Sequence, residues 1–230
     1  MKLQAALDFD YRSTNRGQTE ELTIFWTELA QALVGEARES LDIIEVGTPF
    51  VMEYGLAPVR KLKQAFPEKL ILADLKIADA GYYEAAAAFK SGADIATVLA
   101  VTDDATILNA MTAAKEYGHS IMVDMLAVPD LPTRLMQVDA LGVDYICLHT
   151  SKDLQRLDQD MSKSFEVLRS YVKNAKLAIA GGINRTTIEK FAAICPDVII
   201  VGEGITGAAD YGEAAAFFKA AMDAVERGER

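Results

Sequence analysis

The chain has 230 residues, of which 51% are hydrophobic, and a formal net charge of -11 at pH 7. This length and apolar content suit one domain with a substantial core. The acidic balance argues against non-specific nucleic-acid binding, which depends on neutralising phosphates. A small anionic substrate remains possible, because a local site can be positive on a negative protein.

The first residues and the cysteines bear on cellular location. The N-terminal run reaches a charge at Asp8, too early for a signal peptide, and no stretch approaches the ~18 apolar residues of a membrane span. Cys147 and Cys195 lack metal-ligand spacing and are expected to be buried free thiols, which favours a reducing compartment. We therefore expect a soluble, cytoplasmic protein.

Eight short apolar runs recur along the chain, each of strand length. Near-continuous apolar runs without clean alternation are typical of strands buried on both faces, as in a parallel sheet. The predicted strands span residues 3–7, 41–46, 70–73, 95–99, 121–123, 145–148, 177–180 and 198–201.

Helix-like segments fill the gaps between these runs. The first carries an apolar stripe at helical spacing, Pro67 ends the second, and Asp103 or Asp104 is expected to cap the fourth. The predicted helices span residues 22–33, 56–66, 82–91, 103–117, 133–141, 162–174, 186–194 and 211–225.

The alternation of eight strands with eight helices predicts an α/β fold, a single (β/α)8 TIM barrel over residues 1–230. A doubly wound open sheet is the main alternative, since it uses the same units. The polar stretch 10–17 is expected to be a loop after the first strand. It would lie on the active-site face of a barrel or be an ordinary solvated loop.

Residues 74–79, Asp-Leu-Lys-Ile-Ala-Asp, place two carboxylates and an ammonium directly after a buried run. Burying unpaired charge is costly, so a structural protein rarely puts three charges there. On a strand, Asp74 and Lys76 point to the same face. Asp79 lies further on, in the loop or at the start of the next helix. The spacing offers a cation held between acids, usable for charge stabilisation or proton transfer.

Polar groups follow most of the predicted strands, at the end where barrel enzymes build their sites. Glu45 and Asp74, on adjacent strands, could hold Mg²⁺ with water and substrate oxygens, or could only pair with Lys76. His149 at a strand end is the better acid–base candidate, whereas His119 beside a helix end is expected to be structural. The candidates of this kind are Asp8, Glu45, Asp74, Lys76, Asp124 and His149.

Glycines follow the seventh and eighth predicted strands, Gly181 with Gly182 and Gly202 with Gly204. Barrels often bind phosphate at this place with backbone N–H groups. Glycine lets the backbone approach a ligand closely and adopt positive φ. The alternative is ordinary turn chemistry, but the two pairs together favour a phosphate site.

Seven segments together resemble the orotidine-monophosphate-decarboxylase-like superfamily of barrels. Within it they are most similar to the hexulose-6-phosphate synthases and next to the 3-keto-L-gulonate-6-phosphate decarboxylases. The ten-residue match at 72–81 is the most specific. The matching segments are 6–8, 44–48, 72–81, 123–125, 148–150, 179–183 and 201–207.

The resemblance implies a homodimer, Mg²⁺ and a phosphorylated ketose substrate. The synthase joins formaldehyde to D-ribulose 5-phosphate, giving D-arabino-hex-3-ulose 6-phosphate, and the decarboxylase removes CO₂ from a phosphorylated keto acid. Both pass through an enediolate. The metal and Lys76 would neutralise its developing charge.

The resemblance also implies a role for each matching residue. Glu45 and Asp74 would be metal ligands, Lys76 the catalytic lysine, and Asp8 an acid that positions the substrate. Asp79 would enter the partner subunit's site, and His149 would transfer protons. The phosphate-binding turns would be Gly181, Gly182, Gly202 and Gly204.

Three positions favour the synthase over the decarboxylase. The decarboxylases typically carry Glu at the place of Asp124, Thr at the place of Ala180, and arginines in the segment 150–152, where Lys152 keeps only the charge. The decarboxylase, acting on its own or a related keto acid, therefore stays the alternative.

Two features depart from the family pattern. The segment between the first two strands is longer than the resemblance implies. Glu203 lies where the family usually has Arg or Gly beside the phosphate, and a carboxylate about 4 Å from it would cost about 4 kcal/mol per charge pair at a dielectric constant of about 20. Glu203 must therefore point away from the phosphate, pair with a cation, or indicate that the substrate is a different one. A sugar-phosphate-binding barrel without catalysis is the further alternative.

Overall fold

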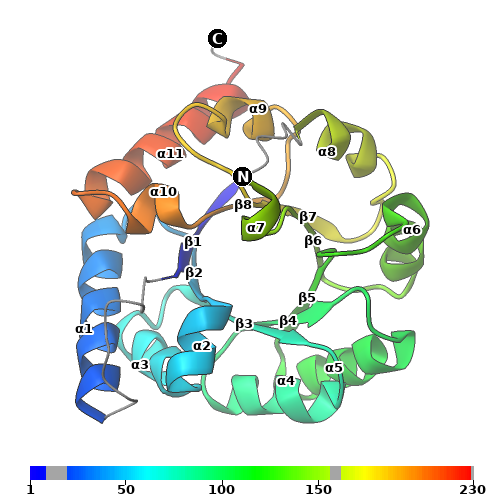
Figure 1. Ribbon diagram of the computed structural model, residues 1–230, viewed down its shortest axis with the longest axis horizontal. Helices are drawn as coiled ribbons and strands as arrows, with labels where there is room; N and C mark the ends of the chain where they lie inside the picture. Colours follow the sequence, from blue (N-terminus) through cyan, green and yellow to red (C-terminus); the bar gives the residue numbers. More distant parts are fainter. Residues whose placement is uncertain (9–19, 156–161, 229–230) are drawn as a thin grey trace.

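The computed structural model describes residues 1–8, 20–155 and 162–228. Eight parallel strands form a closed barrel in sequence order, and helices surround it (Figure 1). The first strand pairs with both the second and the last. The (β/α)8 barrel is therefore confirmed, and the open-sheet alternative is wrong.

The strands agree closely with the apolar runs, apart from the second and third. The predicted second strand, 41–46, begins two residues before the observed one, which starts at Ile43. The third continues past the apolar run to Ile77. The strands are β1 (Lys2–Leu7), β2 (Ile43–Val46), β3 (Leu70–Ile77), β4 (Ile95–Leu99), β5 (Ser120–Asp124), β6 (Tyr145–His149), β7 (Lys176–Ala180) and β8 (Val198–Val201).

The helices include three that the sequence patterns missed, α2, α7 and α10, each too short for apolar periodicity to appear. The helices of the described residues are α1 (Glu20–Ala37), α2 (Thr48–Tyr54), α3 (Ala57–Ala65), α4 (Gly81–Lys90), α5 (Asp104–Tyr117), α6 (Leu131–Ala140), α7 (Lys152–Gln155), α8 (Ser162–Arg169), α9 (Ile188–Ala192), α10 (Glu203–Thr206) and α11 (Tyr211–Glu226). Among them, none is long and apolar enough to cross a bilayer.

The end of α8 and the cap of α5 differ from expectation. α8 ends at Arg169, before the expected residue 174, because the backbone N–H groups of Lys173, Asn174 and Ala175 donate to the buried carboxylate of Asp139 at 2.9–3.0 Å. Asp103 occupies the N-cap position of α5, but its side chain makes no capping hydrogen bond. The expected loop at 10–17 lies outside the described residues.

Four aspartates occupy equivalent positions at the amino-terminal end of the barrel, one for every second pair of neighbouring strands. The residue preceding β2, β4, β6 and β8 accepts a hydrogen bond through Oδ2 from a backbone N–H of β1, β3, β5 and β7 respectively. The distances are 2.9, 2.7, 3.0 and 2.8 Å for Asp42, Asp94, Asp144 and Asp197. Each bond gives a partner to a backbone N–H near the start of a strand.

One of the two cysteines lies in a turn that leads to one of these aspartates. Gly92 and Gly142 stand two residues before their aspartates with φ of 100° and 79°, and Cys195 holds the matching place with φ of 54°. Cys147 is buried as expected, but Cys195 is exposed. The expectation of two buried thiols is therefore wrong for Cys195, because its turn lies on the surface.

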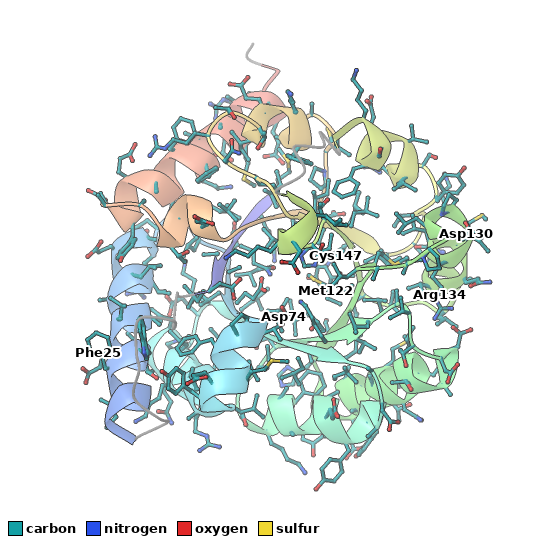
Figure 2. All side chains as sticks on the ribbon, in the orientation of Figure 1. Phe25, Asp74, Met122, Asp130, Arg134 and Cys147 are labelled. Carbon is teal, nitrogen blue, oxygen red and sulfur yellow. The ribbon has the colours of Figure 1, made fainter. Side chains whose placement is uncertain are left out.

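Two apolar layers hold the barrel and orient the site. The larger packs the outer faces of the strands against the helices, and the smaller fills the barrel interior from residues such as Ile43, Leu72 and Met122. Figure 2 shows Asp74, Met122 and Cys147 within the ring of strands and Phe25 on the outer helix α1. Because side chains alternate along a strand, interior-facing polar residues nearer the carboxyl ends of the strands than this smaller apolar layer face the barrel mouth.

Candidate functional site

The charged cluster begins at a bulge near the end of β3. Ala73 pairs with Ala96 and Ile77 with Val98, so three residues of β3 lie opposite the single residue Thr97 of β4. Lys76 has a φ of 49°, which is uncommon for a residue other than glycine. The side chains of Asp74 and Lys76 meet there, as the motif at 74–79 predicts. The expectation that Lys76 lies between the two acids of this motif is wrong for Asp79, because the second acid beside Lys76 is Asp124.

Lys76 is held between two acids at the carboxyl ends of the strands. Its Nζ donates to Asp74 Oδ2 at 2.6 Å and lies 3.5 Å from Asp124 Oδ2. Burial lowers the pKa of Lys76, but the charges of Asp74 and Asp124 outweigh it and hold that pKa well above its ordinary value. Lys76 is therefore a cation at neutral pH and cannot serve as a base.

Asp124 also orients His149. His149 Nδ1 lies 2.9 Å from Asp124 Oδ2, and the N–H of Leu126 donates to Asp124 Oδ1 at 3.0 Å. Burial raises the pKa of Asp124, but His149, Lys76 and this N–H outweigh it, so the pKa is lowered. Because an ionised carboxylate only accepts hydrogen bonds, Nδ1 is the nitrogen that donates to Asp124, and in a neutral ring Nε2 would be the acceptor.

Three carboxyl groups crowd the opposite side of the mouth. The pKa of Glu45 is raised well above its ordinary value by burial and by Asp74 and Asp8, although Gln4 Nε2 donates to Glu45 Oε2 at 2.6 Å. Burial and Asp74 also raise the pKa of Asp8, against the opposing charges of Lys152 and Lys76. Asp8 Oδ1 is buried with no hydrogen-bond partner among the described residues.

These groups fit a hard divalent cation. Neighbouring acidic side chains, of which Glu45 and Asp8 have raised pKa values, and a buried oxygen of Asp8 without a described partner are what such an ion would satisfy. Within the described ranges no group of three or more acidic, histidine or cysteine side chains is arranged as a metal site. Glu45 and Asp74 would then be two protein ligands, with water and substrate filling the rest. Asp74 also pairs with Lys76, whereas the hydrogen bond of Glu45 is to Gln4.

The two glycine turns differ from one another. Gly181 and Gly182 have φ of 97° and 72°, which agrees with the expected positive φ. Gly202 has a φ of −95°, and Gly204 is not among the residues with positive φ. The expectation that glycine is needed for positive φ is therefore wrong for this second pair. Glycine is needed at 204 for packing, because a Cβ would lie 2.9 Å from Phe218 Cζ and from Val201 Cγ1.

Glu203 and Asp79 lie outside the cluster. Glu203 begins α10 and is exposed, and no described cation forms an ion pair with it. Its exposure favours the expectation that it points away from the phosphate turns. Asp79 is also exposed, and its Oδ1 accepts from the N–H of Ala80 at 2.7 Å. Among the described contacts, none joins Asp79 to Lys76 or His149.

Three polar residues support the site although the sequence analysis gives none of them a role. Thr48 Oγ1 donates to Asp74 Oδ2 at 2.6 Å, Thr97 Oγ1 donates to Asp74 Oδ1 at 2.8 Å, and Gln4 binds Glu45. The signal that could have found Gln4 and Thr97 is a single polar residue within an apolar strand. His119 is structural as expected, with its ring centroid 5.1 Å from that of Phe89.

Comparisons with known proteins agree with this geometry. The model of the orotidine 5'-phosphate decarboxylase / HUMPS family matches residues 1–218. A 3-hexulose-6-phosphate synthase of Bacillus subtilis (strain 168) is 49% identical over 187 residues, 81% of this chain and 89% of the relative. The crystal structure of 3-hexulose-6-phosphate synthase from Salmonella typhimurium superposes with a TM-score of 0.86 at 35% identity, covering 100% of both chains. That of 3-keto-L-gulonate-6-phosphate decarboxylase from Vibrio cholerae gives 0.78 at 25% identity, covering 96% of this chain and 97% of the other.

Proposed function

The chain belongs to the orotidine 5'-phosphate decarboxylase / HUMPS family, and from this premise we propose that it is a 3-hexulose-6-phosphate synthase. This lyase joins formaldehyde to D-ribulose 5-phosphate and gives D-arabino-hex-3-ulose 6-phosphate. The observation that carries the proposal is the position of the Lys76 ammonium between Asp74 and Asp124, beside a histidine that contacts Asp124. The higher identity to synthases than to the decarboxylase supports it.

The residues divide the chemistry between charge and proton transfer. His149 Nε2 takes a proton from C1 of ribulose 5-phosphate, and Lys76 neutralises the negative charge that develops on the sugar's carbonyl oxygen. The resulting enediolate attacks formaldehyde through C1, forming the new carbon–carbon bond. The alkoxide oxygen of the former formaldehyde then takes the proton back from His149, so that no proton is gained or lost.

Mg²⁺, held by Glu45 and Asp74, would supply Lewis-acid polarisation of the sugar carbonyl. Asp8 positions the sugar hydroxyls from the same side of the mouth. The turns at Gly181, Gly182, Gly202 and Gly204 receive the phosphate with their backbone N–H groups. α7 projects over the barrel opening (Figure 1), which places Lys152 near Asp8 and adds a positive charge there.

The proposal includes a homodimer in which Asp79 serves the partner's site. Asp79 precedes Tyr82 and Tyr83, which are 38% and 79% exposed, and Thr102 Oγ1 binds Ala78 O at 2.7 Å beside Val101, which is 51% exposed. The proposal places the contact with the partner subunit at these exposed side chains beside Asp79. Cytoplasmic location completes the proposal, because two unpaired cysteines are typical of a reducing compartment.

One assay separates this function from its alternatives. Purified protein is mixed with Mg²⁺, ribulose 5-phosphate and formaldehyde, and formaldehyde loss is followed with the product identified by NMR. Stoichiometric consumption with formation of the hexulose phosphate is expected. CO₂ release from 3-keto-L-gulonate 6-phosphate without formaldehyde consumption would instead indicate the decarboxylase, and neither reaction would indicate a binding barrel.

Replacing Gly47 with alanine should lower kcat/KM by about 10- to 100-fold, since small misplacements of a positioning group have effects of this size. A Cβ at Gly47 would lie 1.9 Å from Asp8 Oδ1, although its φ of −63° suits any residue. The carboxylate of Asp8 must then move. The matched control is Gly35→Ala on α1, where nothing lies within 4 Å of the added Cβ. It should keep full activity, and equal activity of both variants would contradict the role of Asp8.

A further inference from the structure

Thr97 is a buried polar residue in the middle of β4. It is 4% exposed, and the other residues of its strand, from Ile95 to Leu99, are apolar. Strand alternation places its side chain on the interior face with that of Ile95. A buried hydroxyl needs hydrogen-bond partners, and both partners of Thr97 belong to the charged cluster of β3.

The directions of these two hydrogen bonds are fixed by chemistry. The backbone N–H of Lys76 donates to Thr97 Oγ1 at 2.9 Å, and Thr97 Oγ1 donates to Asp74 Oδ1 at 2.8 Å. An amide can only donate and a carboxylate oxygen only accepts, so the hydroxyl has a single arrangement. One side chain therefore joins the backbone of Lys76 to the carboxylate of Asp74.

The bulge makes this bridge necessary. Three residues of β3 lie opposite Thr97 alone, so regular ladder pairing is lost between Ala73 and Ile77. Lys76 is held at a φ of 49°, a left-handed conformation that is strained for a residue with a Cβ. At the bulge, where the regular pairing is interrupted, the hydroxyl of Thr97 accepts the hydrogen bond of the backbone N–H of Lys76. It thereby offsets part of the strain.

We infer that Thr97 is a positioning residue for the reaction, an inference that rests on the proposed function of Lys76 and Asp74. Thr97 holds the backbone from which the Lys76 side chain extends toward the mouth. It also sets the rotation of the Asp74 carboxylate, leaving Oδ2 to Lys76 and Thr48. Because Thr97 is buried, it acts through these two residues and does not bind the substrate itself.

Thr97→Val tests the inference, because it keeps the shape of the side chain and removes both hydrogen bonds. We expect kcat to fall by about 10- to 100-fold, as for other residues that orient a site's ligands, with KM for ribulose 5-phosphate changed by less than about threefold. Thr97→Ser retains the hydroxyl and should keep kcat within about threefold of the wild type. The matched control is Thr112→Val on α5, whose exposed hydroxyl donates to Leu108 O, and it should keep full activity.

Crystal structures of the variants provide a readout that does not depend on activity. Lys76 should leave the positive-φ region in Thr97→Val and retain it in Thr97→Ser. An unchanged Lys76 conformation in Thr97→Val, or a kcat that falls only in proportion to the folded fraction measured by circular dichroism, would overturn the inference. If the wild type consumes no formaldehyde, the proposed function fails, and the conformation of Lys76 alone then decides the role of Thr97.

Discussion

Replacing Lys76 with alanine is expected to lower kcat for hexulose phosphate formation by about 10³-fold, the upper end of the range for losing one group that stabilises developing charge. Lys76 is the cation that contacts both Asp74 and Asp124. Without it, these acids and Glu45 would repel the negative charge that forms on the sugar. No rearrangement of the neighbouring acids can supply the missing positive charge.

The barrel should survive this substitution. Asp74 keeps its hydrogen bonds from Thr48 and Thr97, and the apolar layer outside the strands is untouched. Lys115→Ala, at an exposed position on α5, is the matched control and should keep full activity. Steady-state kinetics with a thermal melt of each variant provide the measurement. A Lys76→Ala enzyme that retains a tenth of wild-type kcat would show that this cluster is not the catalytic centre.

Mixing two inactive variants should restore activity if the sites are shared between subunits. Asp79→Asn and Lys76→Ala each remove one member of every site in their own homodimers. In a mixed dimer, the Asp79→Asn subunit keeps its Lys76 and receives an intact Asp79 from its partner. Random mixing should therefore restore about a quarter of wild-type activity, because half of the dimers are mixed and each has one complete site.

The mixing experiment has an internal control and a clear contrary result. Lys76→Ala mixed with a second Lys76 variant, Lys76→Met, should stay inactive, because no combination supplies the lysine. If Asp79 acts in its own subunit, the mixture of Asp79→Asn and Lys76→Ala stays inactive as well. An Asp79→Asn homodimer with normal kcat would remove Asp79 from the mechanism.

Much of the barrel could be predicted from the sequence because its strands are short apolar runs with local signals. The end of β3 could not, since Asp74 and Lys76 interrupt the apolar run while remaining in the strand. The bulge at Lys76 depends on Thr97 of another strand, and no pattern within β3 reveals it. The short helix α2 was missed because its seven residues make too few turns for periodicity.

The sequence predicts which residues lie at the strand ends that form the site, but it predicts few of the hydrogen bonds between them. The contacts of Lys76 with Asp74 and of His149 with Asp124 join residues that the strand-end pattern places at one mouth. The supporting roles of Gln4, Thr48 and Thr97 depend on which residues face each other across strands. That register is set by barrel closure, which is a property of the whole chain.

The most direct measurement follows the C1 protons of ribulose 5-phosphate by ¹H NMR in D₂O, with enzyme and Mg²⁺ but without formaldehyde. Proton abstraction by His149 with charge stabilisation by Lys76 predicts exchange of a C1 proton for deuterium. The exchange should stop when EDTA removes the metal and should be absent in Lys76→Ala. Exchange that persists in both cases, or a wild-type enzyme that consumes formaldehyde without any C1 exchange in this experiment, would contradict the proposed chemistry.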